Sequence, residues 1–296
     1  DEAPYGHQDP AWSYDGSGLY YVQNGFAQGE SASRIVYVDL ASESVVRFGS
    51  SGYIEPAVSP DGRWIAATRI DKKKGSDVVI MSAATGEVLL EVTRTGRSWS
   101  PAWSPDGQTL AATLSRDGGS QLYTMDAALG GEPRRISQSV SIDTEPAFAP
   151  DGRQLYFVSD RGGSPQIYRL PSGGGGAERV TFAGSYNISP ALSPDGKLLA
   201  YGMHASGSEI GHMHVIEVAT GKQLLPPIDR VRFAGASWRK NGSGLFFSRL
   251  RPGFESMRST ERFADTGRYY LDLNQPNPDK LIFNTSMYAE LKLPSF

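Results

Sequence analysis

The stretch Pro101–Gly107, PAWSPDG, returns along the chain as a series of near copies. These copies are PAWSYDG at Pro10–Gly16, PAVSPDG at Pro56–Gly62, PAFAPDG at Pro146–Gly152, PALSPDG at Pro190–Gly196 and a worn ASWRKNG at Ala236–Gly242. The acidic position falls at Asp15, Asp61, Asp106, Asp151 and Asp195, with Asn241 in the sixth slot, in steps of 46, 45, 45, 44 and 46 residues. A period of about 45 residues with four short apolar runs in each period is typical of a β-propeller.

One repeat, residues 143–181, shows how the period divides into strands. The β-forming runs predict strands at 144–148, 154–158, 166–170 and 178–181. The turn between the first two is explained residue by residue: Pro150 presets φ, Asp151 bonds its own backbone two residues on, and Gly152 supplies a positive φ. The Pro-Asp-Gly phrase is therefore interpreted as a turn, because it recurs in blade after blade whereas catalysis needs one site.

The repeat predicts the fold class and the domain organisation together. We expect an all-β, six-bladed β-propeller of four-stranded antiparallel blades, with residues 1–296 forming a single domain. The expected blades cover residues 8–48, 54–93, 99–137, 144–181, 188–225 and 234–285, followed by a tail at 286–296. The ring closes either through a tail strand at 288–293 or through residues 1–7, and we expect weak closure in which the first and last blades are held mainly by face packing.

Composition limits the classes of function. The net charge of −3 argues against nonspecific nucleic-acid binding. The chain has no cysteine, so thiol chemistry and disulfides are excluded, and its apolar runs are too short for a membrane span. It begins at Asp1 without a methionine, which we interpret as a processed form or an excised domain. We expect a monomer.

The middle of the chain resembles a known family. The segments Leu122–Asp126, Thr144–Gly152, Phe157–Gly163, Pro165–Arg169 and Arg179–Asn187 resemble the propeller of the TolB family, whose repeat is the TolB-like (PD40, WD40-like) motif. The match runs from about Ser98 to Leu225. The resemblance implies a noncatalytic protein-interaction propeller, a periplasmic or otherwise extracytoplasmic location, and a protein or peptide partner such as a Tol–Pal-type envelope protein.

The ends of the chain depart from that family. The last repeat, from Ala236 to Phe283, is similar to the propeller of prolyl oligopeptidases. Two alternatives therefore remain open: a substrate-gating propeller module of an oligopeptidase-like enzyme, and a chimeric or engineered propeller scaffold without native activity.

Aligned repeats place two sets of residues near the channel mouth. The first set precedes the repeat proline: Asp9, Glu55, Ser100, Glu145, Ser189 and Gly235. The second set lies two residues earlier: His7, Tyr53, Ser98, Asp143, Asn187 and Phe233. Because strand side chains alternate with period 2, we expect both sets on one side of their strands. The predicted binding residues at the channel mouth are His7, Asp9, Tyr53, Glu55, Asp143, Glu145 and Asn187. In one interpretation they form an acidic funnel that accepts a basic segment of a partner or a cation. In the alternative they cap neighbouring backbone amides and bridge the blades.

Other chemistry is not predicted. His204, His212 and His214 are interpreted as packing and rim residues, so we expect no metal and no cofactor. A Gly-x-Ser-x-Gly nucleophile elbow is missing, and no catalytic residue is predicted. The insertion at 249–266 is interpreted as a loop folded onto the propeller rim, with exposed anchors at Phe254, Met257 and Phe263 as the alternative.

Overall fold

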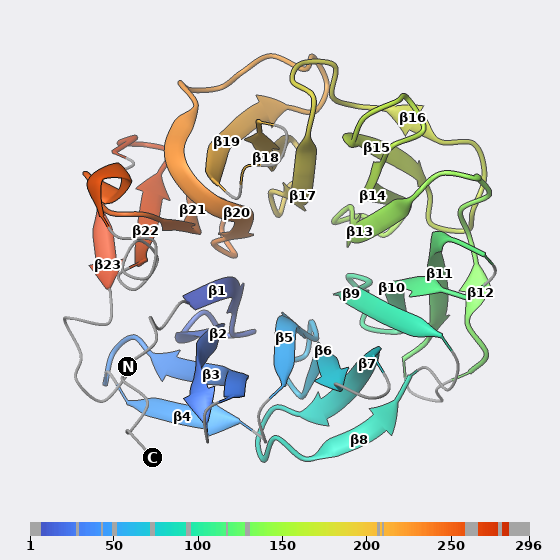
Figure 1. Ribbon diagram of the computed structural model, residues 1–296, viewed down its shortest axis with the longest axis horizontal. Helices are drawn as coiled ribbons and strands as arrows, with labels where there is room; N and C mark the ends of the chain where they lie inside the picture. Colours follow the sequence, from blue (N-terminus) through green and yellow to red (C-terminus); the bar gives the residue numbers. More distant parts are fainter. Residues whose placement is uncertain are drawn as a thin grey trace.

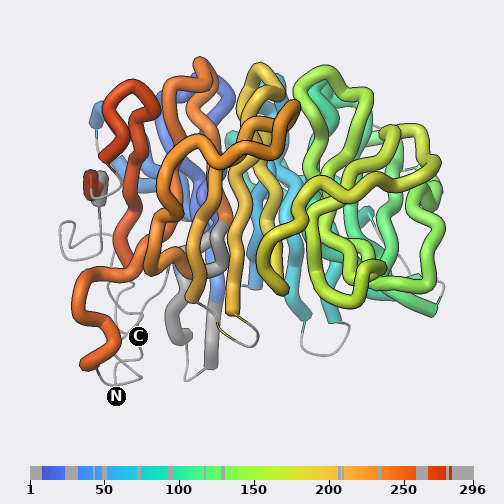
Figure 2. The backbone as a smooth tube through the Cα atoms, turned by 90° about the horizontal axis from the view of Figure 1, so that it is seen from above, coloured from blue at the N-terminus to red at the C-terminus, as the bar shows by residue number. Residues whose placement is uncertain are grey.

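The computed structural model describes residues 7–27, 30–42, 44–48, 52–71, 75–92, 96–116, 118–127, 131–205, 208, 210–257, 266–277 and 280–283, with the backbone alone at 7–8, 24–27, 30–32, 233–234 and 282–283. These residues form antiparallel sheets arranged radially around a central axis (Figure 1), and the sheets make one layer when seen from the side (Figure 2). Within this described part of the chain, no helix is long and apolar enough to cross a bilayer.

Four sheets have four strands each, in sequence order from the axis outward. The first holds β1 (His7–Trp12), β2 (Gly18–Ala27), β3 (Glu30–Asp39) and β4 (Val45–Phe48). The second holds β5 (Tyr53–Val58), β6 (Trp64–Asp71), β7 (Gly75–Ser82) and β8 (Val88–Glu91). The third holds β9 (Arg97–Trp103), β10 (Thr109–Ser115), β11 (Ser120–Asp126) and β12 (Arg134–Arg135). The fourth holds β13 (Asp143–Phe148), β14 (Gln154–Ser159), β15 (Gln166–Pro171) and β16 (Glu178–Arg179).

The remaining strands form one seven-stranded sheet. Its members are β17 (Asn187–Leu192), β18 (Leu198–His204), β19 (Ile210–Glu217), β20 (Ile228–Trp238), β21 (Gly244–Arg249), β22 (Gly267–Asp272) and β23 (Leu281–Phe283). The first half of β20 pairs with β19, and its second half pairs with β21. We interpret β20 as the outer strand of a fifth blade that continues into the inner strand of a sixth. The prediction of six blades depends on that division.

The recurring motif forms the turn between the first two strands, as predicted. In the third blade the Asp106 carboxylate accepts the backbone N–H of Gln108 at 3.0 Å, and Gly107 has a φ of 70°. The motif serine adds a contact that the sequence did not reveal: the Ser104 hydroxyl donates to Asp106 at 2.5 Å and accepts the N–H of Thr109 at 2.9 Å. Both side chains therefore hold the turn, and their charge and hydroxyl are already engaged.

The core lies between blades. For example, Ala111 and Leu122 of the third blade pack against Leu155 and Phe157 of the fourth, and all four are fully buried. Because each middle strand is covered on both faces, its residues are apolar almost throughout, as the sequence suggested.

The first and last blades also meet through their faces. Leu19 and Tyr21 share a cluster with Phe246 and Tyr270, and the ring of Trp12 contacts that of Phe246 edge-on, with centroids 4.5 Å apart. The predicted face packing is therefore present. The two closing routes, residues 1–7 and 288–293, lie outside the described residues apart from the backbone of His7.

Candidate functional site

A cavity of about 380 Å³ opens on the axis, where the inner strands converge. Its lining includes every member of the first predicted set: Asp9, Glu55, Ser100, Glu145, Ser189 and Gly235. They come from the inner strands β1, β5, β9, β13, β17 and β20, which surround the centre in Figure 1. The structure therefore brings the six residues of the first set together, and their role in binding stays a prediction.

The backbone at this ring has an unusual conformation. Asp9, Glu55, Ser100, Glu145 and Ser189 all have φ between 51° and 55°, in the left-handed region. Each lies where the register between the inner strand and its neighbour shifts, as in a β-bulge. A positive φ costs a non-glycine residue on the order of 1 kcal/mol or more. Because the feature repeats in blade after blade, we attribute it to the architecture and not to one functional position.

The ring carboxylates bridge neighbouring blades. Glu55 accepts the backbone N–H of Ser100 at 2.7 Å and the Thr68 hydroxyl at 2.6 Å. Likewise Asp9 accepts the N–H of Glu55 at 3.2 Å, and Glu145 accepts the N–H of Ser189 at 2.6 Å, although each pair lies in different blades. These contacts match the amide-capping alternative for the ring. Each carboxylate oxygen has two lone pairs and is therefore able to accept more than one hydrogen bond.

The carboxyl group of Glu145 has a raised pKa. Desolvation in the cavity raises its pKa from 4.5 to about 7, and the negative charges of Glu55 and Asp9 add to the effect. The N–H of Ser189 opposes the shift by stabilising the charged form. The cavity therefore holds a carboxyl group that changes charge close to neutral pH.

The second predicted set does not share this cavity. None of its described members lines the cavity; Tyr53 is only 5% exposed, and Ser98, Asp143 and Asn187 are fully buried. The expectation that both sets lie on one side of their strands is therefore wrong, because the bulge at the intervening residue breaks the alternation of side chains. The side chains of His7 and Phe233 lie outside the described residues.

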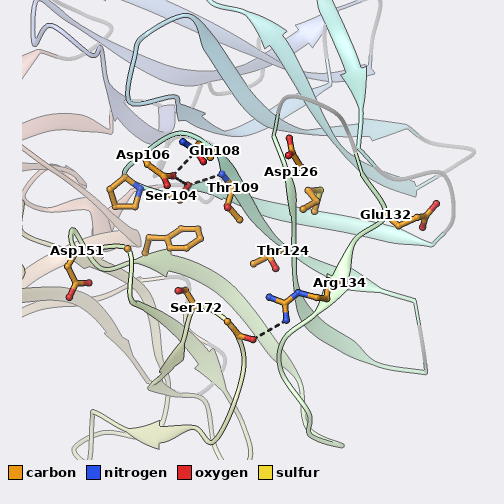
Figure 3. A pocket seen from close by; sticks show the side chains of 15 residues that line it. Ser104, Asp106, Gln108, Thr109, Thr124, Asp126, Glu132, Arg134, Asp151 and Ser172 are labelled. Carbon is orange, nitrogen blue, oxygen red and sulfur yellow. Dashed lines mark hydrogen bonds between the residues drawn. The ribbon is translucent and has the colours of Figure 1, made fainter.

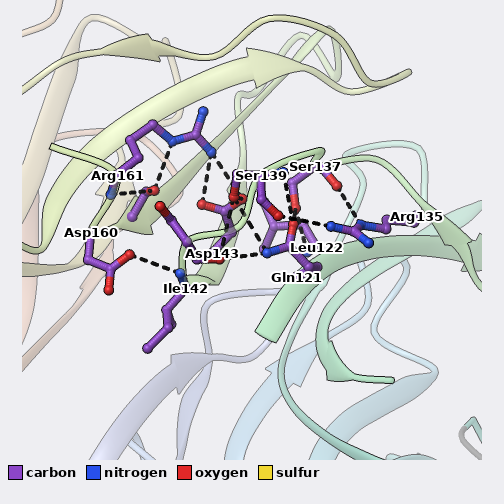
Figure 4. Close-up of polar contacts among 11 residues, drawn as sticks. Gln121, Leu122, Arg135, Ser137, Ser139, Ile142, Asp143, Asp160 and Arg161 are labelled. Atoms are coloured by element: carbon purple, nitrogen blue, oxygen red, sulfur yellow. Dashed lines mark hydrogen bonds and ion pairs between the residues drawn. The ribbon is translucent and has the colours of Figure 1, made fainter. Parts of the chain in front are cut away.

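Asp143 is held in a network of its own (Figure 4). Arg161 Nη2 contacts both carboxylate oxygens, at 2.8 and 3.0 Å, and the Ser139 hydroxyl donates at 2.8 Å. The guanidinium also lies over the rings of Phe157 and Tyr168. The sequence alone does not reveal this ion pair, because the two residues are 18 positions apart.

Asn187 has a comparable structural environment. Its amide nitrogen donates to Gln166 Oε1 at 2.9 Å and to the Ala183 carbonyl at 2.8 Å. The amide thereby ties the inner strand β17 to the fourth blade. Binding roles for Asp143 and Asn187 remain predictions, and their burial favours structural ones.

Comparison with known proteins supports this architecture. A family model described as the TolB beta propeller domain (PD40) matches residues 19–277. The chain belongs to this TolB propeller family.

Solved structures agree with the family assignment. The crystal structure of TolB from Acinetobacter baumannii matches with a TM-score of 0.67 and 26% identity, over 92% of this chain and 61% of that one. This TolB-family chain thus spans less than two thirds of that protein. A protein of Agrobacterium tumefaciens described as a TolB matches with a TM-score of 0.66 and 22% identity, over 80% of this chain and 87% of that one.

Enzymes share the same fold. The oligogalacturonate lyase of Vibrio parahaemolyticus has a TM-score of 0.63 over 97% of this chain and 80% of its own, at only 14% identity. A likeness at that identity concerns the fold alone. The similarity of the last repeat to prolyl oligopeptidase propellers stays a prediction.

The histidines of this TolB-family propeller do not converge on one point. His214 stacks on Tyr201 with centroids 5.4 Å apart, and its Nδ1 lies 3.0 Å from Gln223 Oε1. His204 is buried with Nδ1 3.2 Å from the Ser208 carbonyl, whereas His212 is exposed. Among the residues that the structure describes, no group of three or more His, Cys, Asp or Glu is placed to hold a metal ion.

The insertion after β21 is described as far as Met257. Phe254 is only 6% exposed, so the alternative of an exposed anchor is wrong at that position and the chain folds onto the rim there, in the short helix Phe254–Ser256. Phe263 lies outside the described residues.

Two further hollows lie between blades, away from the axis. One of about 650 Å³ separates the third and fourth blades, and Figure 3 shows Asp106, Asp126, Glu132 and Asp151 around it together with Arg134. The other, of about 580 Å³, separates the fourth and fifth blades. Each lies beside an outer strand of only two residues, β12 or β16. A short outer strand covers less of the next blade, which explains both hollows.

Proposed function

We propose that this chain is a noncatalytic interaction propeller of TolB type that binds a protein or peptide segment at the axial cavity. The supporting observation is the cavity itself, where Asp9, Glu55 and Glu145 converge from three blades. Three carboxylates in a volume of about 380 Å³ favour a cationic occupant. We therefore propose that a basic segment of the partner, carrying an arginine or lysine side chain, enters there.

Glu145 gives this proposal a measurable signature. A cation bound beside a carboxylate favours its charged form, so binding and ionisation of Glu145 reinforce each other. Because the pKa of Glu145 is about 7, a basic peptide is expected to bind more tightly at pH 8 than at pH 6.

The test is a calorimetric titration with a short peptide of arginine and lysine, against an aspartate and glutamate peptide of equal length. Glu145→Gln is expected to weaken binding of the basic peptide and to remove the pH dependence, and Glu55→Gln to weaken binding as well. Glu87→Gln, at an exposed position of the second blade, makes the same charge change far from the cavity and serves as the control. Unchanged affinity in both cavity variants would mean that the carboxylates only bridge blades.

The wider biological setting is part of the same proposal. We propose that the chain acts outside the cytoplasm as a monomer, and that its partner is an envelope protein of the Tol–Pal kind. The support is membership of the TolB family, together with the 26% identity to the Acinetobacter protein over most of this chain. A pull-down from bacterial envelope extract, compared between the wild type and Glu145→Gln, tests this setting: equal recovery of every protein would contradict it.

A further inference from the structure

The hollow between the fourth and fifth blades is chemically unlike the other two. Its described lining contains Arg169, Arg179 and His214 but no aspartate or glutamate. The axial cavity and the hollow at the third blade are lined by three and four acidic residues respectively. We propose that this basic groove docks an acidic segment of a protein partner, with a carboxylate at Arg179 and an apolar side chain beside Phe182.

The groove exists because the fourth blade has a short outer strand. β16 consists of Glu178 and Arg179 alone, whereas β4 and β8 have four residues each. The facing side of the fifth blade is therefore left partly uncovered, and Tyr201, Met203 and His214 line the opening. Its volume of about 580 Å³ lies within the range of binding pockets.

Arg179 supplies a positive charge without a counter-ion. Its Nε donates to the Thr181 carbonyl at 2.6 Å, and the guanidinium lies over the Phe182 ring, 5.2 Å from its centroid. Among the described residues, no carboxylate forms an ion pair with it. Arg169, in contrast, is paired with Glu178 at 2.9 Å. Arg179 is thus the cation of the groove that is open to an incoming carboxylate, and its planar fork suits that geometry.

Two aromatic residues complete the recognition surface. Phe182 is 75% exposed, an unusual position for a large apolar ring, and it carries Arg179 on its face. Tyr201 is only 4% exposed, and it lines the groove. Its hydroxyl is a donor that an acceptor atom of a bound segment would engage.

The composition of the groove is that of a protein-binding surface. Arginine, tyrosine, phenylalanine and methionine are the residues enriched at interface centres, and all four types occur here. Burial lowers the pKa of His214 from its ordinary value of 6.5, which favours the neutral ring at pH 7, so the arginines carry the charge. An acidic occupant follows from charge complementarity.

Two methionines allow the site of binding to be read directly. Met203 lines the groove, and Met125 lines the acidic hollow at the third blade. The protein is labelled with ¹³C at its methionine methyl groups and titrated with a short peptide of aspartate, glutamate, phenylalanine and leucine. The Met203 signal is expected to shift while the Met125 signal stays fixed. A counterpart peptide with lysine in place of each acid is expected to leave Met203 unmoved.

Variants then test the residues. Arg179→Ala is expected to weaken the acidic peptide roughly tenfold, the usual loss for one charge-assisted hydrogen bond. Arg134→Ala is the matched control, because Arg134 is also an outer-strand arginine that donates to a backbone carbonyl, that of Gly173 at 3.0 Å. Phe182→Ala removes an exposed ring, leaves the core intact and is expected to weaken binding too; Tyr201→Phe tests the hydroxyl.

The proposal is overturned if the acidic peptide moves neither methyl signal, moves Met125 alone, or binds Arg179→Ala and Arg134→Ala equally well. It is also overturned if the lysine peptide moves Met203 more than the acidic one. None of these outcomes affects the axial cavity, whose proposed occupant has the opposite charge.

Discussion

Replacing Glu145 by glutamine should stabilise the protein at alkaline pH. The folded state raises the pKa of this carboxyl from 4.5 to about 7. Since one pKa unit corresponds to about 1.4 kcal/mol, ionising Glu145 in the folded protein costs on the order of 3 kcal/mol. Glutamine retains an oxygen that accepts the N–H of Ser189 but carries no charge. The weaker hydrogen bond to a neutral amide offsets part of the gain, so we expect a net of about 2 kcal/mol at pH 8.

The sign of the pH dependence follows from the direction of the shift. A carboxyl with a raised folded-state pKa binds its proton more tightly in the folded than in the unfolded chain, so its stabilising contribution is fully present below pH 4.5. That contribution is lost as pH rises through about 7. Wild type and Glu145→Gln should therefore have similar stability at pH 4.5 and diverge in favour of the variant up to pH 8.

Urea unfolding at a series of pH values measures the effect. The difference between the unfolding free energies of Glu145→Gln and wild type is the observable, and Glu87→Gln reports the effect of changing the net charge by one unit. A variant that is less stable than wild type at pH 8 would refute the reasoning, because the charged carboxylate would then contribute more as a bridge to Ser189 than its desolvation costs. A constant difference at every pH would likewise show that the carboxyl does not titrate in this window.

Three other changes probe the scaffold. Arg161→Ala leaves the buried Asp143 without its counter-ion and should cost about 3–5 kcal/mol in urea unfolding; Asp143→Asn in that background should recover part of the loss, and no recovery would contradict the ion-pair explanation. Hydrogen bonds lower the pKa of Asp15 and Asp61 from 3.8 to about 2, so the stability that these carboxylates contribute is present above pH 3.8 and is lost as pH falls towards 2. Ser59→Ala removes one of these hydrogen bonds and should make the urea midpoint less dependent on pH in the acid range. An unchanged dependence would exclude the serine as its source. Trp238→Phe removes the hydrogen bond from the indole N–H to the Ala191 carbonyl at 2.9 Å, and it should lower the free energy of unfolding by about 1–3 kcal/mol because the carbonyl loses its partner. The equivalent position of the fourth blade is Phe148, so a phenylalanine fits this place in a blade. A much larger loss of stability in thermal unfolding would show that the shape of the side chain and not the hydrogen bond is decisive.

The sequence predicted those features that repeat. Pro-Asp-Gly marks a turn by local chemistry alone, and the spacing of the motif brings Asp9, Glu55 and Glu145 to one cavity. The prediction from the sequence failed where the backbone conformation of one residue interrupts the alternation of side chains along a strand. Nothing in the residue types before each proline announces a left-handed φ, since glutamate is not a residue that favours it. The bulge that results turns Tyr53 and Asp143 away from the axis.

The sequence also does not predict which side chains pair with residues far along the chain. Arg161 reaches Asp143 only after a hairpin has folded, and Ser100 meets Glu55 only after two blades have docked. Pairings of this kind leave no spacing rule in a single sequence. The protonation of Glu145 is equally invisible, because it arises from desolvation and from two carboxylates contributed by other blades.

In a ring of repeats, structural and functional features differ in how often they occur. A feature that recurs in blade after blade, such as the positive φ of the five residues before the repeat proline, serves the assembly, because these blades must dock in the same way. A feature that occurs once is free to serve binding. We place in that second kind the raised pKa of Glu145 and the position of Arg179, which forms no ion pair with a described carboxylate and lies over an exposed Phe182. Glu145 follows a blade whose ring residue is a serine, Ser100, and its N–H donates to the Thr113 hydroxyl at 3.2 Å. Arg179 lies in an outer strand of only two residues. These two departures from the repeat are the places where we propose that the propeller recognises partners, with opposite charges and at separate positions.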